Sequence, residues 1–145
     1  MSDRYELQLP WRTPPLSLNG RMHHMARARL VREVRETAGW LAQAARIPRA
    51  ERVRVELRYT PRTRCRRDAD NLVPTFKALV DGLVDAGVVP DDDDAHVERL
   101  MPTITAPGRV AAPLVLVVEA LVQFSDVSGQ AARIGSSWAR RRPSG

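Results

Sequence analysis

The sequence predicts an α+β domain in which a small mixed β-sheet packs with two α-helices, in the order β-α-β-α-β-β. Three patterns carry this prediction: apolar and polar residues alternate over residues 5–9 and 53–59, apolar stripes at helical spacing cover 25–46 and 72–83, and a β-branched run covers 114–124. With 145 residues, 43% of them hydrophobic, the chain has the size of one domain with one core.

The first half of the chain contains two expected strands and one helix. Tyr5 to Leu9 alternates apolar with polar side chains, and Pro10 ends this strand. From Met25 to about Arg46, apolar residues recur at steps of three and four, which predicts an amphipathic helix that Pro48 closes. Val53 to Tyr59 then forms the clearest strand, because its apolar residues alternate with charged ones.

The second helix is expected to begin close to Asp70 or Asn71, because Pro74 is tolerated only in a first turn. Gly87 stands where a helix C-terminus favours glycine. Residues 95–104 are expected to hold a short strand before the long final one.

A domain over residues 1–124 is expected to precede a tail over residues 125–145. The run 114–124 suits a central strand, since β-branched residues pack well inside a sheet. The tail is rich in Ser, Gly and Arg and has no apolar period, so we expect it to be flexible and basic.

Several classes of protein are excluded by composition. No apolar run approaches the roughly 20 residues that a bilayer span needs, and no secretory signal is readable. The single cysteine, Cys65, permits neither an internal disulfide nor a cysteine-based zinc site. No phosphate-cradling glycine motif indicates a nucleotide cofactor. We therefore expect a cytoplasmic protein that does not associate with membranes.

Charge is strongly segregated within the net charge of +6. Residues 1–67 carry 16 Arg against 6 acids, residues 68–98 carry one Lys against 9 acids, and residues 99–145 carry 6 Arg against 2 acids. A basic body around an acidic island suits a protein that holds a polyanion and places a hard cation against it. A genome biased toward arginine codons would account for the arginine excess, but not for the island.

Asp68 and Asp70 are the first candidate metal ligands. In an extended segment, side chains two residues apart point the same way, so both carboxylates would meet at one point. Their repulsion at 4–5 Å is on the order of 3–4 kcal/mol unless a cation lies between them. Oxygen ligands without His or Cys favour Mg²⁺, with Mn²⁺ as a substitute. A purely structural alternative is that Asp70 caps the helix.

Lys77 and Asp81 are expected on the same helix face as Asp70, since 7 and 11 residues at 100° each leave them within about 20°. Lys77 is the single lysine beside 22 arginines. The alternative is an ordinary surface ion pair between Lys77 and Asp81. The run Asp91 to Asp94 is either a solvated turn or the source of a third carboxylate, and a return along the helix just allows the latter.

These residues resemble the RusA-type Holliday junction resolvases, which are small dimeric endodeoxyribonucleases common in phages. The resemblance covers roughly residues 5–122 and rests on three stretches: Arg66-Arg67-Asp68-Ala69-Asp70-Asn71-Leu72, Asp81-Gly82-Leu83 with Ala86-Gly87, and Asp91-Asp92. Leu9-Pro10-Trp11, Asn19 and Arg21 support it. It implies a symmetric dimer, in a bacterium or a phage-infected host, that resolves four-way junctions in DNA recombination, repair or phage DNA processing.

The resemblance also implies the roles of individual residues. Asp68, Asp70 and Asp92 match the three catalytic aspartates that would hold Mg²⁺, with Asp91 as the alternative third ligand. The family lysine stands four residues after the second aspartate, where this chain has Pro74, and Lys77 would take its place. The implied reaction is phosphodiester hydrolysis by a metal-activated water. The DNA-binding side chains would be Arg21, Arg27, Arg29, Arg64, Arg66 and Arg67.

Two other classes of function fit the same residues. In a noncatalytic DNA-binding regulator, the acidic island would be only a solvated helix and loop. In a Ca²⁺-stabilised interaction module, the carboxylates would hold a structural metal. Scattered histidines such as His23 and His96 lack the spacing of metal ligands.

Overall fold

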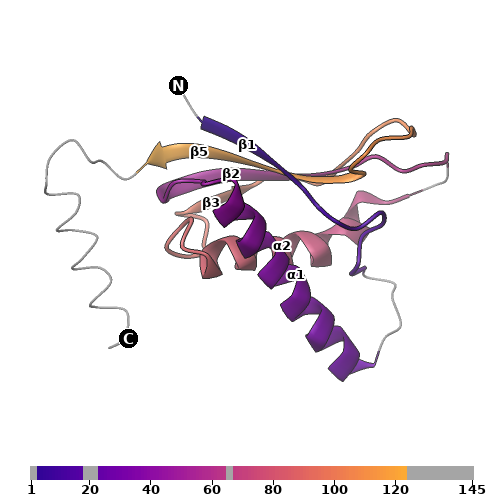
Figure 1. Cartoon of the computed structure of the whole chain (residues 1–145), viewed down its shortest axis with the longest axis horizontal. Helices are drawn as coiled ribbons and strands as arrows, with labels where there is room; N and C mark the ends of the chain where they lie inside the picture. Colours follow the sequence, from indigo (N-terminus) through magenta and orange to yellow (C-terminus); the bar gives the residue numbers. More distant parts are fainter. Residues whose placement is uncertain (1–2, 18–22, 65–66, 124–145) are drawn as a thin grey trace, which may run out of the picture.

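The computed structural model describes residues 3–17, 23–64 and 67–123. In chain order its elements are β1 (Asp3–Gln8), α1 (His24–Ala44), β2 (Ala50–Tyr59), the 3₁₀ turn η1 (Ala69–Leu72), α2 (Val73–Asp85), β3 (Val97–Arg99), β4 (Thr103–Ile104) and β5 (Leu114–Gln123). Both helices lie on the same side of one sheet (Figure 1). The predicted α+β class and mixed sheet are therefore confirmed.

The sheet has the strand order β1-β5-β2-β3, with β4 also paired to β2. β5 lies antiparallel to both β1 and β2, so its prediction as a central strand is confirmed. β3 and β4 run parallel to β2. The single short strand expected in residues 95–104 is instead two, because Pro102 between them has no N–H to continue the ladder.

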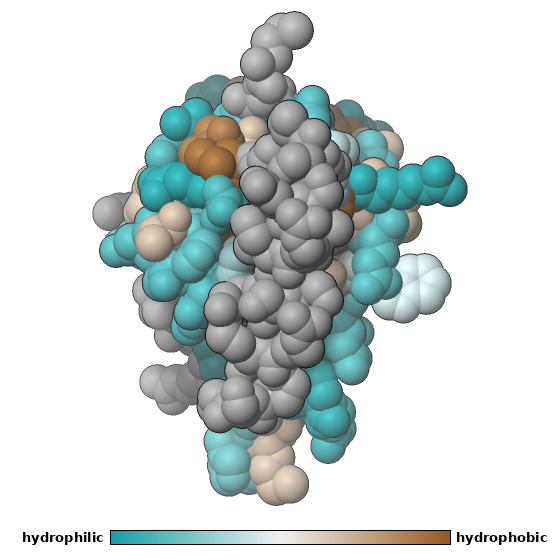
Figure 2. Space-filling view, turned by 90° about the vertical axis from the view of Figure 1, so that its left-hand side faces the viewer, coloured by the Kyte–Doolittle hydropathy of each residue, from teal (hydrophilic) through white to brown (hydrophobic). Residues whose placement is uncertain are grey.

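The core lies between the sheet and the helices. On β2, Val53, Val55 and Leu57 are fully buried, as their alternation predicts. The predicted apolar face of the second helix is also buried; it consists of Leu72, Phe76, Leu79 and Leu83. On the face drawn in Figure 2, most of the described residues are hydrophilic. Among the described residues, no helix has the length and apolarity to cross a membrane.

The two helices approach closely at Gly82. A Cβ on Gly82 would lie 2.3 Å from the carbonyl oxygen of Arg35 and 2.8 Å from the Cβ of Ala38. Next to this contact, Arg35 donates two hydrogen bonds of 2.9 Å to the carboxylate of Asp85. Because Gly82 has no side chain, α2 packs closely against α1 at this point. The ion pair between Arg35 and Asp85 holds the C-terminal end of α2 in place.

Helix α2 begins later than the sequence predicts and ends as predicted. The expected start close to Asp70 or Asn71 falls in the 3₁₀ turn η1, and the α-helix itself begins at Val73. Pro74 lies in its first turn, where its missing N–H costs little. Gly87 adopts a left-handed φ of 84° just past the helix. The N–H groups of Gly87 and Val88 donate to the carbonyls of Val84 and Leu83, which caps the C-terminus and reverses the chain.

Candidate active site

The reversal after α2 brings Asp92 back to the exposed side of that helix. Lys77 Nζ lies 3.6 Å from Asp81 Oδ2 and 3.7 Å from Asp92 Oδ2. Lys77 and Asp81 share a face because they are four residues apart on a helix. The expected surface pair of Lys77 and Asp81 is thus present, and Asp92 joins it from the following loop.

The four aspartates of the loop divide between different contacts. Asp91 Oδ1 accepts a 2.7 Å hydrogen bond from the N–H of Asp92. Asp93 accepts from the N–H of His96. The side chain of Asp94 is fully exposed, and its carboxylate lies 3.9 Å from the guanidinium of Arg99. Of these four aspartates, only Asp92 has its carboxylate next to Lys77. Asp92, and not Asp91, is therefore the residue that faces the helix.

Arg99 holds the loop in this position. Its guanidinium donates to the backbone carbonyl of Asp92 and lies 3.7 Å from the carboxylate of the same residue. Arg52 adds a 3.0 Å hydrogen bond to the carbonyl of Asp94. Two arginines, one on β2 and one on β3, therefore anchor the backbone that carries Asp92.

The carboxylates of Asp81 and Asp92 both lie near Lys77 and differ in acidity. Burial raises the pKa of Asp81, although Lys77 and Arg35 oppose that rise. For Asp92, burial also acts to raise the pKa, but Lys77 and the neighbouring side chains of Asp81, Asp91 and Arg99 outweigh it, so the pKa is lowered. Asp92 is therefore the more acidic of the two carboxyl groups.

Asp68 and Asp70 lie at the other end of α2. Asp68 is the residue before η1, and Asp70 is inside that turn. We predicted that Asp68 and Asp70 lie in one extended segment with their side chains pointing the same way. This prediction is wrong, because the 3₁₀ turn begins between the two residues. Both residues are exposed, and neither side chain contacts a charged group among the described residues. Asp68 has no side-chain capping bond either.

Helical rise separates the two acidic positions. From Asp70 to Asp81, three residues of 3₁₀ turn and eight of α-helix amount to about 18 Å. In the described part of one chain, no three Asp, Glu, His or Cys side chains come together as a metal site would require. The expected ligand set of Asp68, Asp70 and Asp91 or Asp92 is therefore not assembled in a single copy. The loop after α2 brings Asp92 back along the helix only as far as Lys77 and Asp81.

The predicted DNA-binding arginines lie in several places. Arg27 and Arg29 are in the first turns of α1, whose N-terminus is capped by His23. Arg64 is exposed, and the guanidinium of Arg67 lies 5.6 Å from the centre of the Tyr59 ring. Arg21 and Arg66 fall outside the described residues, as does the predicted tail.

Two residues that contribute to the site, Asp81 and Arg99, were not among the predicted site residues. Asp81 was expected only as a neighbour of Lys77, and its pairing with Asp92 depends on the path of the loop. Arg99 carries no local motif that marks it as an anchor. Both contacts are tertiary, and helical spacing alone can indicate only that Asp81 shares a face with Lys77.

Fold and site together define a two-layer α+β protein with a lysine between two carboxylates. No family model matches the chain. A protein from Xylella fastidiosa (strain Temecula1 / ATCC 700964), named "Uncharacterized protein", is 31% identical over 128 residues, which cover 85% of this chain and 81% of that protein. The chain belongs to the same family as this Xylella protein.

Proposed function

We propose that the protein is an endodeoxyribonuclease that resolves four-way DNA junctions by paired phosphodiester cleavage, as its resemblance to the RusA-type resolvases implies. One observation carries the proposal. Lys77 and Asp92, to which the resemblance gives catalytic roles, are 15 residues apart in sequence, yet their charged groups lie 3.7 Å apart. This contact lies outside the core, and Arg99 already holds the loop, so the fold does not require it.

The residues of the site have complementary properties for this chemistry. The ionised carboxylate of Asp92 can accept a proton from, or orient, an attacking water. Lys77 is 66% exposed at its side chain, so a phosphate oxygen can reach its ammonium group. An ammonium group placed there stabilises the negative charge that develops on a phosphate during cleavage.

The Mg²⁺ requirement rests on the resemblance alone. Since Asp68 and Asp70 lie at the far end of α2 from Asp92, the three expected ligands do not meet in one chain. In a symmetric dimer, carboxylates of the two copies can approach one another, and two sites related by a two-fold axis suit paired cuts in opposed strands. We therefore propose a homodimer as the active form.

The proposal is tested with a labelled four-way junction, with Mg²⁺ or EDTA, and three proteins. Wild type is expected to cut the junction only with the metal, and Asp70→Asn is expected to bind it as well or better but not to cut. Asp94→Asn removes the same charge from a fully exposed side chain and serves as the matched control, with cleavage unchanged. Cleavage by Asp70→Asn at the wild-type rate would contradict the role of Asp70.

The same assay separates the other two functions. A noncatalytic DNA-binding regulator would bind junctions and cut nothing under any condition. A Ca²⁺-stabilised interaction module would lose many degrees of melting temperature on chelation, whereas an open catalytic site would lose activity with little change in stability.

A further inference from the structure

Two groups of four arginines in this protein have different surroundings. On the outer face of the sheet, four arginines interleave with four glutamates. The closest of these ion pairs joins Arg54 Nε to Glu98 Oε2 at 2.6 Å, and Arg54 also reaches Glu119 at 3.2 Å. The face consists of Arg4, Arg52, Arg54 and Arg58 against Glu6, Glu56, Glu98 and Glu119. It therefore carries no excess charge with which to attract a polyanion.

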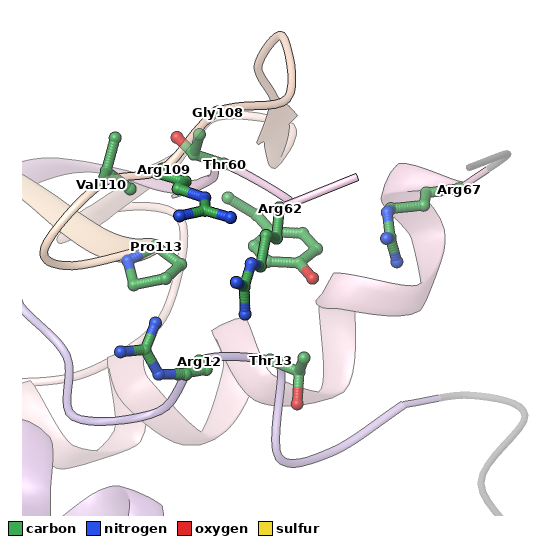
Figure 3. Close-up of a pocket in the computed structure, with 10 residues that line it drawn as sticks. Arg12, Thr13, Thr60, Arg62, Arg67, Gly108, Arg109, Val110 and Pro113 are labelled. Atoms are coloured by element: carbon green, nitrogen blue, oxygen red, sulfur yellow. The ribbon is translucent and has the colours of Figure 1, made fainter. Parts of the chain in front are cut away.

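The second group lines a pocket of about 550 Å³ at the end of the sheet where β2 stops. Arg12 comes from the segment after β1, Arg62 and Arg67 from the segment after β2, and Arg109 from the segment before β5. Figure 3 shows the side chains of Arg12, Arg62 and Arg109 converging on the hollow, with Arg67 across from them. No acidic residue lines the pocket, and none of the four forms an ion pair among the described residues.

The backbone beneath these arginines is held by hydrogen bonds. The N–H of Thr60 donates to Pro113 at 2.8 Å, and that of Gly108 donates to Pro61 at 3.0 Å. The hydroxyl groups of Thr60 and Thr105 are 2.7 Å apart. The segments that present Arg62 and Arg109 are therefore tied to each other. Four like charges kept close together without counter-charge repel, unless an anion occupies the space between them.

We propose that this four-arginine pocket binds backbone phosphates of a DNA strand, as an anchoring contact separate from the Lys77 and Asp92 site. The guanidinium fork matches phosphate oxygens in a two-pronged geometry. Thr13 and Thr60 also line the pocket, so its wall is polar beside the arginines. The identification of the strand as DNA rests on the proposed function, whereas the preference for phosphate rests on the pocket itself.

The test compares two double variants with equal loss of charge. Arg12→Gln/Arg109→Gln removes two pocket arginines. Arg4→Gln/Arg46→Gln removes two arginines elsewhere, one in β1 and one past the end of α1. None of these side chains is buried, so all four substitutions should leave the melting temperature nearly unchanged.

Fluorescence anisotropy with a four-way junction and with a single-stranded oligonucleotide then gives Kd as a function of salt. The pocket variant is expected to bind both at least about tenfold more weakly at near-physiological salt, and to reduce the slope of log K against log salt by about 2. The control is expected to change the slope by much less. Equal losses in the two variants would overturn the proposal, because they would reflect net charge only.

Two further arms separate the outcomes. If a 5′-phosphorylated oligonucleotide binds wild type more tightly than its 5′-hydroxyl form, and the pocket variant loses this difference, the pocket takes a terminal phosphate and the backbone assignment is wrong. If wild type cuts no junction but the pocket variant still loses DNA affinity, the proposed nuclease fails and the pocket stands. If wild type cuts and the pocket variant binds and cuts equally well, the pocket proposal alone fails.

Discussion

Asp81 and Asp92 share one cation, since Lys77 Nζ lies within 3.7 Å of a carboxylate oxygen of each. Their pKa values shift in opposite directions: that of Asp81 is raised, first of all by burial, and that of Asp92 is lowered by Lys77 and neighbouring side chains in spite of burial. As pH rises, Asp92 therefore loses its proton before Asp81 does.

This difference predicts opposite pH profiles of stability for two conservative variants in metal-free buffer. The folded-state pKa of Asp92 lies below 3.8, so its stabilising contribution is present above that pH and is lost as pH falls through the folded value. Asp92→Asn should therefore lower the free energy of unfolding at pH 7 by less than about 1 kcal/mol, because the pair is partly exposed, and should match wild type in strong acid.

For Asp81 the sign is reversed. Its folded-state pKa lies above 3.8, so it favours the folded state below that pH and loses this contribution as pH rises through the folded value. Asp81→Asn replaces the partly buried charge by a neutral side chain of nearly the same shape. It is expected to equal or exceed wild type in stability at pH 7, measured by thermal unfolding. A clear loss at pH 7 would show that the ion pair with Lys77 outweighs the burial of the charge.

Gly82→Ala tests the close approach of the two helices. The added Cβ would meet a backbone oxygen at 2.3 Å, which cannot move aside as a side chain can. We expect a loss of about 3 kcal/mol in the free energy of unfolding, at the upper end of overpacking costs. Gly108→Ala is the control, since nothing lies within 4 Å of a Cβ there, and it should change stability by about 0.5 kcal/mol at most.

Thr75→Val tests the link between α2 and the loop after β1. The fully buried hydroxyl of Thr75 donates to the carbonyl of Leu16 at 2.8 Å and accepts from its N–H at 3.1 Å. Valine keeps the shape but leaves both backbone groups unsatisfied, at a cost of about 2 kcal/mol in urea unfolding. Thr75→Ser, which keeps the hydroxyl and loses one methyl, should cost about 1 kcal/mol. A larger loss for serine than for valine would contradict this account.

Arg46→Gly is expected to stabilise the protein. Arg46 ends α1 with a left-handed φ of 57°, which glycine adopts without steric cost. The gain should be about 0.5–1 kcal/mol in the free energy of unfolding. Arg46→Ala loses the same charge but keeps the unfavourable backbone, so it should show no such gain.

Local patterns predicted most of the fold. Alternation located β2, helical stripes located both helices, and Gly87 located the end of α2, because each of these signals acts within a few residues. The start of α2 was predicted two or three residues too early, since residues 69–72 form a 3₁₀ turn. The division of the short strand into β3 and β4 was missed, although Pro102 marks it in retrospect.

The site was predicted less completely, because its contacts depend on the path of the chain. Helical spacing placed Lys77 beside Asp81, but the extended geometry assumed for Asp68 and Asp70 gave way to a 3₁₀ turn. The pairing of Asp81 with Asp92 and the convergence of Arg12, Arg62 and Arg109 join segments distant in sequence. No local pattern in a single sequence reports such contacts.

The most direct test of the central claim is the rate at which Asp92→Asn cuts a labelled four-way junction in Mg²⁺, relative to wild type and to Asp94→Asn. We predict symmetric paired nicks from wild type and from Asp94→Asn, and a rate at least about 100-fold lower from Asp92→Asn, with junction binding retained. Equal cutting by Asp92→Asn, or tight junction binding by wild type without any cleavage, would contradict the account.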